Sequence, residues 1–169
     1  NPSSPVVVVS INTSALTQSV GVFVSGRYAY VASRSGVLAI VDVNNAFSGA
    51  LRIVGSVSDA TNLSGAVSVF VSGRYAYVAG FDSNRLAVVD ISVPSSPVVV
   101  GAAVSSTDLN VYAESSQAVF VSGRYAYVAA ARDTTNDKLT IVDLQGADFS
   151  SVSAGSVSVG SIQVADMLD

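Results

Sequence analysis

Three stretches of the chain alternate large apolar residues with small or polar ones, and all three read VFVSGRYAYVA. In the first copy, Tyr28 and Tyr30 fall on one face while alanine and valine occupy the other, which is the period of a β-strand. Ser25 and Gly26 interrupt the pattern, and glycine can take the positive φ that a tight hairpin needs. Each copy therefore predicts two antiparallel strands. The copies run from Val22 to Ala32, Val69 to Ala79 and Val119 to Ala129.

A second apolar element follows each copy and ends in an aspartate, at Asp42, Asp90 and Asp143. Another apolar stretch comes after it, so each unit contains four predicted strands, which we name A to D in chain order. The units recur after 47 and 50 residues, counted between their turn glycines. A period of this length built from short strands is typical of propeller blades rather than helical repeats. We expect an all-β fold, a β-propeller with three complete four-stranded antiparallel blades and partial blades at both ends.

The two ends of the chain have the pattern of incomplete blades. Residues 1–11 repeat the Pro-Ser-Ser-Pro-Val-Val-Val sequence that ends the second unit, so we predict that they form the last strand of a preceding blade. The first residue is Asn1 rather than Met, so we expect that an upstream segment has been removed or was never included. Incomplete blades expose strand edges, which favours a homo-oligomer or a piece of a longer propeller. The predicted units are 18–58 for blade 1, 66–104 for blade 2, 116–159 for blade 3 and 160–169 for the start of a following blade.

The aspartate-ending elements read LAIVD, LAVVD and LTIVD, and the chain resembles the LVIVD-repeat family through them. The flanking V-S-G-x-Y-A-Y-V-A and Asp-Ile-Ser-x-Pro-Ser-Ser-Pro-Val sequences are also similar to that family. The second position of each element is alanine or threonine rather than valine. The resemblance implies β-propellers of bacterial or archaeal surface or secreted proteins, and thus an extracellular or cell-surface location. It implies no general catalytic activity.

Composition excludes several classes of function. The 169 residues are 50% hydrophobic and 12% charged, with a net charge of −4 and neither His nor Cys. An acidic chain lacks the basic surface that nucleic acids require. Without His and Cys, disulfides and most zinc, haem and iron–sulfur sites are excluded. No apolar run approaches the roughly 18 residues of a membrane span.

The loops that join strands B to C and D to A differ between units, whereas the A–B turn is always Ser-Gly-Arg. Loops that vary on a constant frame often form binding faces, so we predict a face for a protein or glycan partner, although the same side chains could simply be solvated. Their carboxylates could also hold Ca²⁺, which takes several oxygen ligands, but we predict no cofactor. The predicted site residues are Asp82, Asp108, Tyr112, Glu114, Arg132, Asp133 and Asp137.

The recurrent side chains of the repeat have simpler structural interpretations. We expect the paired tyrosines to pack between blades, with a carbohydrate platform as the alternative, and the strand-ending aspartates to cap loop amides. We expect the arginine after each A–B turn to be exposed and paired with an acid of the next unit. A serine nucleophile would need Lys138, the only lysine, as its base, so we predict no enzyme. Asn12 and Asn62 begin N-glycosylation triplets.

Three functional hypotheses follow. The first is a non-enzymatic extracellular or cell-surface scaffold that binds a partner through the B–C and D–A loops. The alternative is a self-assembling structural protein, in which open blade ends join copies into a ring, layer or filament. A weaker alternative is part of a propeller hydrolase whose active residues lie in other units.

Overall fold

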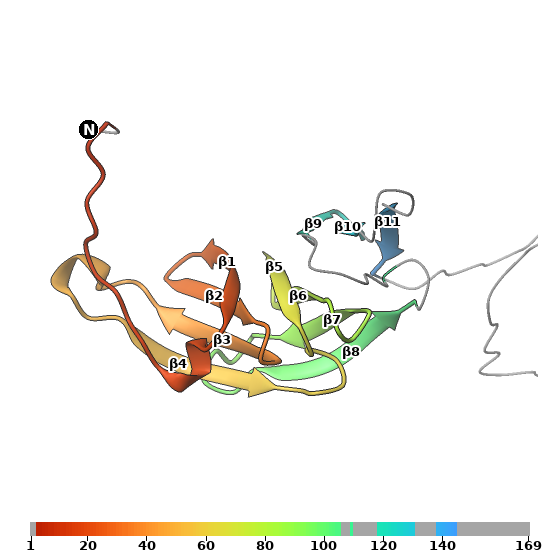
Figure 1. Cartoon of the computed structure of the whole chain (residues 1–169), viewed down its shortest axis with the longest axis horizontal. Helices are drawn as coiled ribbons and strands as arrows, with labels where there is room; N and C mark the ends of the chain where they lie inside the picture. The colour runs from red at the N-terminus through yellow and green to blue at the C-terminus, as the bar shows by residue number, and fades with distance from the viewer. Residues whose placement is uncertain (1–2, 106–108, 110–117, 131–137, 145–169) are drawn as a thin grey trace, which may run out of the picture.

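The computed structural model describes residues 3–105, 109, 118–130 and 138–144, and it is built from three antiparallel sheets that follow one another along the chain (Figure 1). Each sheet is a meander in which neighbouring strands are consecutive in sequence. The sheets therefore confirm the predicted blades. Blade 1 contains β1 (Ser19–Ser25), β2 (Tyr28–Ser33), β3 (Val37–Asp42) and β4 (Arg52–Ser58); blade 2 contains β5 (Ala66–Ser72), β6 (Tyr75–Gly80), β7 (Arg85–Asp90) and β8 (Val98–Val104); blade 3 contains β9 (Ala118–Ser122), β10 (Tyr125–Ala130) and β11 (Lys138–Asp143).

Tight hairpins set the register within each blade. Ser25 pairs with Tyr28 across the first A–B turn, and Gly26 between them has a φ of 59°. The equivalent Gly73 and Gly123 have φ values of 59° and 60°. This left-handed conformation is accessible to glycine at little cost, so the three identical turns confirm the predicted role of the glycine.

The described residues include two short 3₁₀ turns, η1 (Ser14–Leu16) and η2 (Ala46–Ser48). No helix among the described residues has the length and apolar character needed to cross a membrane. The turn η1 contacts β2 and β3, so it lies against one side of blade 1.

The core lies between the sheets rather than within a closed ring. Between blades 1 and 2, Tyr30, Leu38 and Ile40 of the first blade pack against valines and alanines of the second. The same arrangement recurs between blades 2 and 3, where Tyr77 and Leu86 face the valines of β9. Large side chains on one surface thus fill the space left by small ones on the other. Burial also raises the pKa of Tyr30 and Tyr77. The expectation that these tyrosines pack between blades is confirmed.

The ends of the chain differ in part from the prediction. Residues 5–11, expected to be the last strand of a preceding blade, form no strand in the structure, and Val6 and Val7 are exposed. A strand needs a hydrogen-bonding neighbour, and none of the described sheets pairs with this segment, which extends away from blade 1 (Figure 1). The predicted last strand of blade 3 and the start of a following blade, 160–169, lie outside the described residues.

Loops between blades hold successive sheets together. After β4, the Leu63 side chain is fully buried in the cluster between blades 1 and 2. The backbone of the same loop binds both blades: the N–H of Gly65 donates to the Arg34 carbonyl (3.2 Å) and the N–H of Phe81 donates to the Gly65 carbonyl (2.8 Å). Asp59 starts this loop and accepts hydrogen bonds from Asn62, whose amide therefore has a structural role. These bonds, chiefly those of the Asn62 side chain, lower the pKa of Asp59.

Candidate functional site

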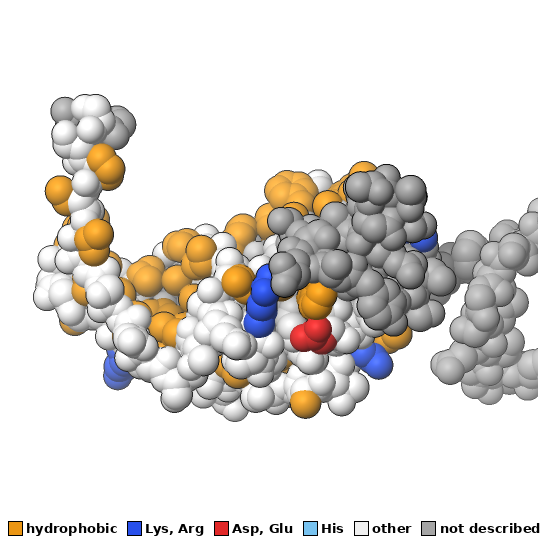
Figure 2. All heavy atoms as spheres, viewed as in Figure 1, with side chains coloured by type: hydrophobic (Ala, Val, Ile, Leu, Met, Phe, Trp, Pro, Cys, Tyr) orange, Lys and Arg blue, Asp and Glu red, His pale blue; other side chains and the backbone are white. Residues whose placement is uncertain are grey.

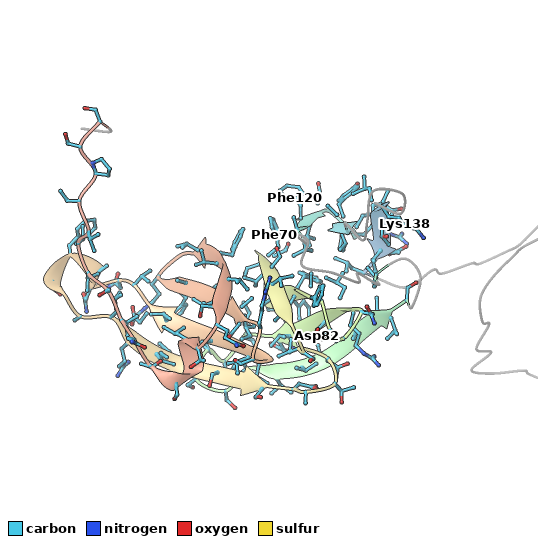
Figure 3. The ribbon with its side chains drawn as sticks, in the orientation of Figure 1. Phe70, Asp82, Phe120 and Lys138 are labelled. Atoms are coloured by element: carbon cyan, nitrogen blue, oxygen red, sulfur yellow. The ribbon has the colours of Figure 1, made fainter. Side chains whose placement is uncertain are left out.

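Of the seven predicted loop-face residues, the structure describes only Asp82. It is exposed in the turn between β6 and β7 (Figure 3), where it makes no hydrogen bond or ion pair with the described residues. No group of three metal-binding side chains occurs among the described residues. Asp108, Tyr112, Glu114, Arg132, Asp133 and Asp137 lie outside the described residues, so the loop-face and Ca²⁺ hypotheses stay predictions there.

The sequence predicted that each recurrent arginine pairs with an acid of the next unit, whereas the ion pairs found among the described residues lie within one blade. Each forms an ion pair with the aspartate that ends strand C of its own blade, as Arg27 does with Asp42. The reason is register: Tyr28 pairs with Asp42, which places the residue before Tyr28 beside that carboxylate. The guanidinium also lies over the adjacent tyrosine, 5.4 Å from the ring centroid of Tyr28. The other two pairs are Arg74–Asp90 and Arg124–Asp143.

Asp42 and Asp90 also cap the loops that follow them, as predicted. The Asn44 N–H donates to Asp42 Oδ1 (3.0 Å), and the Ser92 N–H donates to Asp90 Oδ1 (2.9 Å). Hydrogen bonds from the side chain and backbone of Ser92, and from Arg74, lower the pKa of Asp90 to about 2. The Arg–Asp pairs are thus structural features that order each blade.

The described part of the chain has one apolar surface that is uncovered at its first blade. We call it the valine face, and in blade 1 it includes Val22 and Val24 of β1. These side chains are 66% and 60% exposed, whereas their equivalents in blade 2, Val69 and Val71, are 5% and 8% exposed. In Figure 2, hydrophobic side chains gather between β1 and the N-terminal segment. The equivalents in blade 3, Val119 and Val121, are also buried, because blade 2 covers them.

A second, chemically different surface at blade 3 is left uncovered by the described residues. We call it the aromatic face, and its exposed members are Phe120, Tyr125, Leu139 and Ile141. Leu139 is 66% exposed, whereas Leu38 and Leu86 at the same repeat position are 0% and 1% exposed. The difference again comes from the neighbour: blade 2 covers this surface of blade 1, and blade 3 covers that of blade 2.

The joints between blades show how these two faces fit together. The inner strands β1, β5 and β9 lie next to one another, and their phenylalanines form a ladder. The ring centroids of Phe23 and Phe70 are 4.7 Å apart, and those of Phe70 and Phe120 are 4.9 Å apart (Figure 3). Such tilted and edge-on contacts are favourable aromatic geometries. The N–H of Val119 also donates to Ser68 Oγ (3.2 Å) across the second joint.

Sequence reasoning missed the leucine that each D–A loop places between blades. Leu63 and Leu109 are buried at the two joints, and Leu16 of η1 is half-buried at the open end. A signal was present, because a leucine stands six positions before the first valine of VFVSG in the first two units. In the third unit the longer loop hides this spacing.

Comparison with known families agrees with this repeat architecture. The family model described as the LVIVD repeat matches residues 18–59, 65–103 and 113–157. The chain belongs to the LVIVD-repeat family. Each match contains one blade, so the family repeat and the structural unit coincide.

The solved structures that are similar to the chain include one from a yeast. Hsv2 of Kluyveromyces lactis is similar with a TM-score of 0.39 and 10% sequence identity, over 74% of this chain and 37% of that one. The LVIVD-repeat chain thus spans little more than a third of that protein. No curated protein matches the chain.

Proposed function

We propose that this LVIVD-repeat chain is a non-enzymatic assembly scaffold, which uses its uncovered blade faces to dock further blades of the same kind. The observation that carries the proposal is the contrast between Val22 and Val69. The two valines occupy the same position of an identical sequence, yet one is mostly exposed and the other is buried by a neighbouring blade.

The physical basis is the hydrophobic effect. Removing apolar surface from water contributes roughly 25 cal/mol of stabilisation per Å². The faces that are buried between blades within the chain are already stabilised in this way. An exposed apolar surface of contiguous side chains usually marks an interaction site. The half-buried Leu16 stands at the same spacing before Val22 as the buried Leu63 before Val69, and its turn η1 contacts β2 and β3 of blade 1. The proposal assigns no catalytic step to the chain.

The first test is the solution mass of the chain across a wide concentration range. Light scattering should give a mass that rises above 17.1 kDa with concentration. Val22→Asp/Val24→Asp should remain at the mass of one chain, because a carboxylate at the joint would have to be desolvated. The matched control is Val98→Asp/Val100→Asp on the outer strand β8, where the valines are 53% and 55% exposed. A wild type that stays at one chain throughout, or a control that loses association equally, would refute the proposal.

The loop face supports a second candidate function, the binding of a protein or glycan partner by an extracellular or cell-surface scaffold. The supporting observation is that the D–A loop is bound by backbone hydrogen bonds to the B–C loops of two consecutive blades. Loops of different sequence are thereby held as one continuous surface, on which Asp82 is exposed. The resemblance to surface proteins supports the location, which surface labelling of intact source cells would test.

Asp82→Lys tests the loop-face function, because charge reversal on an exposed turn should leave the fold intact. A panel of glycans and peptides is immobilised, and the wild type is compared with the variant. We expect at least one ligand to lose about tenfold in affinity, which corresponds to about 1.4 kcal/mol. The control is Arg52→Glu, which reverses charge on an exposed residue at the start of β4, where the C–D loop ends and the loop face is not involved. Equal binding by all three proteins would contradict a site at Asp82.

A further inference from the structure

We infer that the partner of the valine face is the aromatic face of a second copy of this chain, so that copies join head to tail. This inference rests on the proposed assembly function and specifies its partner and its polarity. The joint would place Val22 and Val24 of one copy against Phe120, Leu139 and Ile141 of the next. All five side chains are more than half exposed in the single chain.

The first argument comes from the internal joints, which always pair unlike faces. At both joints, tyrosine and leucine of the earlier blade meet the valines of the later blade. Two valine faces would leave gaps between small side chains, and two aromatic faces would place bulky rings in the same space. Protein interiors are densely packed, so both mismatches are unfavourable. Unlike faces are therefore the favoured pair between copies as well.

The second argument concerns the size of the residue at which neighbouring inner strands approach each other. The strands approach closely at Gly21, where an added Cβ would lie only 2.5 Å from the carbonyl oxygen of Val67. The next two units have Ser68 and Ala118 at this position, so all three residues are small. The second joint accommodates Ser68, whose Oγ accepts a hydrogen bond from the Val119 N–H, and Ala118 is smaller than serine, so its size is compatible with a further joint of this kind.

The third argument concerns the phenylalanine ladder. Phe23 contacts Phe70, and Phe70 contacts Phe120, so each ring contacts the ring of the next blade. Phe120 is 58% exposed and has no following blade among the described residues. In a head-to-tail joint, Phe23 of the next copy would lie at the position that continues the ladder.

The three described blades do not cover both faces by themselves. β1 and β9 lie on different blades with blade 2 between them (Figure 1). Propellers close with about four to eight blades, so three do not bring the first and last faces together. A head-to-tail joint between unlike faces is heterologous, so it adds copies in one direction and yields a ring or a filament.

Two variants that block opposite faces test the polarity. Val22→Asp/Val24→Asp removes the valine face, and Phe120→Asp/Ile141→Asp removes the aromatic face. Each variant alone should have the 17.1 kDa mass of one chain. An equimolar mixture should form a one-to-one complex of twice that mass and no larger species, because each variant keeps one intact and complementary face. Circular dichroism checks that each variant retains the strand content of the wild type.

The outcomes separate this inference from the proposed function. Dimers of either variant alone would show that like faces pair, and this overturns the head-to-tail inference while assembly stands. A mixture that stays monomeric beside a wild type that associates also overturns it. A wild type that never associates refutes the proposed function itself. If an aspartate variant does not fold, Val22→Ser/Val24→Ser and Leu139→Ser/Ile141→Ser replace the pairs, with the same expected masses.

Discussion

Leu38→Ala is expected to lower the free energy of unfolding by about 2–5 kcal/mol, as truncation of a fully buried leucine does. Leu38 is 0% exposed between blades 1 and 2, so its removal leaves a cavity in addition to the lost burial. The same change at Leu139, the equivalent position of blade 3, is expected to stay within about 0.5 kcal/mol. Leu139 is largely exposed, so alanine there removes few contacts from the single chain.

Denaturant unfolding followed by circular dichroism measures both variants, at a protein concentration below the onset of association. The pair is closely matched, because each leucine is the second residue of its strand C, and one residue separates it from the Ile-Val-Asp sequence that ends the strand. Equal losses at the two positions would show that blade 3 is covered in solution and that the aromatic face is not open. Leu139→Ala should instead weaken association when the concentration is raised.

The strands could be predicted from the sequence because period-two alternation, turn glycine and apolar runs all agree in each unit. Val22 to Ala32 has the same sequence as Val69 to Ala79, and both form the same hairpin. This also shows the limit of local sequence. Val22 is exposed and Val69 is buried, because burial depends on the neighbouring sheet rather than on the residue or its neighbours in the chain.

The Arg–Asp pairs illustrate a different limit. Arg27 and Asp42 are fifteen positions apart, and their contact follows only from the register of β2 with β3, which pairs Tyr28 with Asp42. Once the strand ends are known, the pair can be deduced from the sequence. For the loops predicted to bind a partner no such rule exists, because their residues differ from unit to unit. Asp82 alone of the predicted loop-face residues lies in the described part of the chain.

At the outer strands of blades 1 and 2, backbone of blade 2 lies very close to a glycine of β4. Gly55 of β4 faces the turn formed by residues 93–96 of blade 2, and a Cβ added there would lie closer than 3.0 Å to the Pro94 carbonyl oxygen. Backbone cannot rotate away as a flexible side chain can, so one sheet must shift. Gly101 occupies the equivalent position of β8, where an added Cβ meets nothing within 4 Å of the described structure.

Gly55→Ala is therefore expected to lower the free energy of unfolding by about 1–3 kcal/mol, the usual cost of overpacking. Gly101→Ala should be neutral or raise it by up to about 1 kcal/mol, because alanine reduces the freedom of the unfolded chain and neither glycine has a positive φ. Denaturant unfolding of both variants decides the matter, since they share the substitution, the strand type and the repeat position. A stabilising Gly55→Ala would mean that blades 1 and 2 are not packed at their outer strands. The internal joint would then no longer be a valid model for the proposed joint between copies.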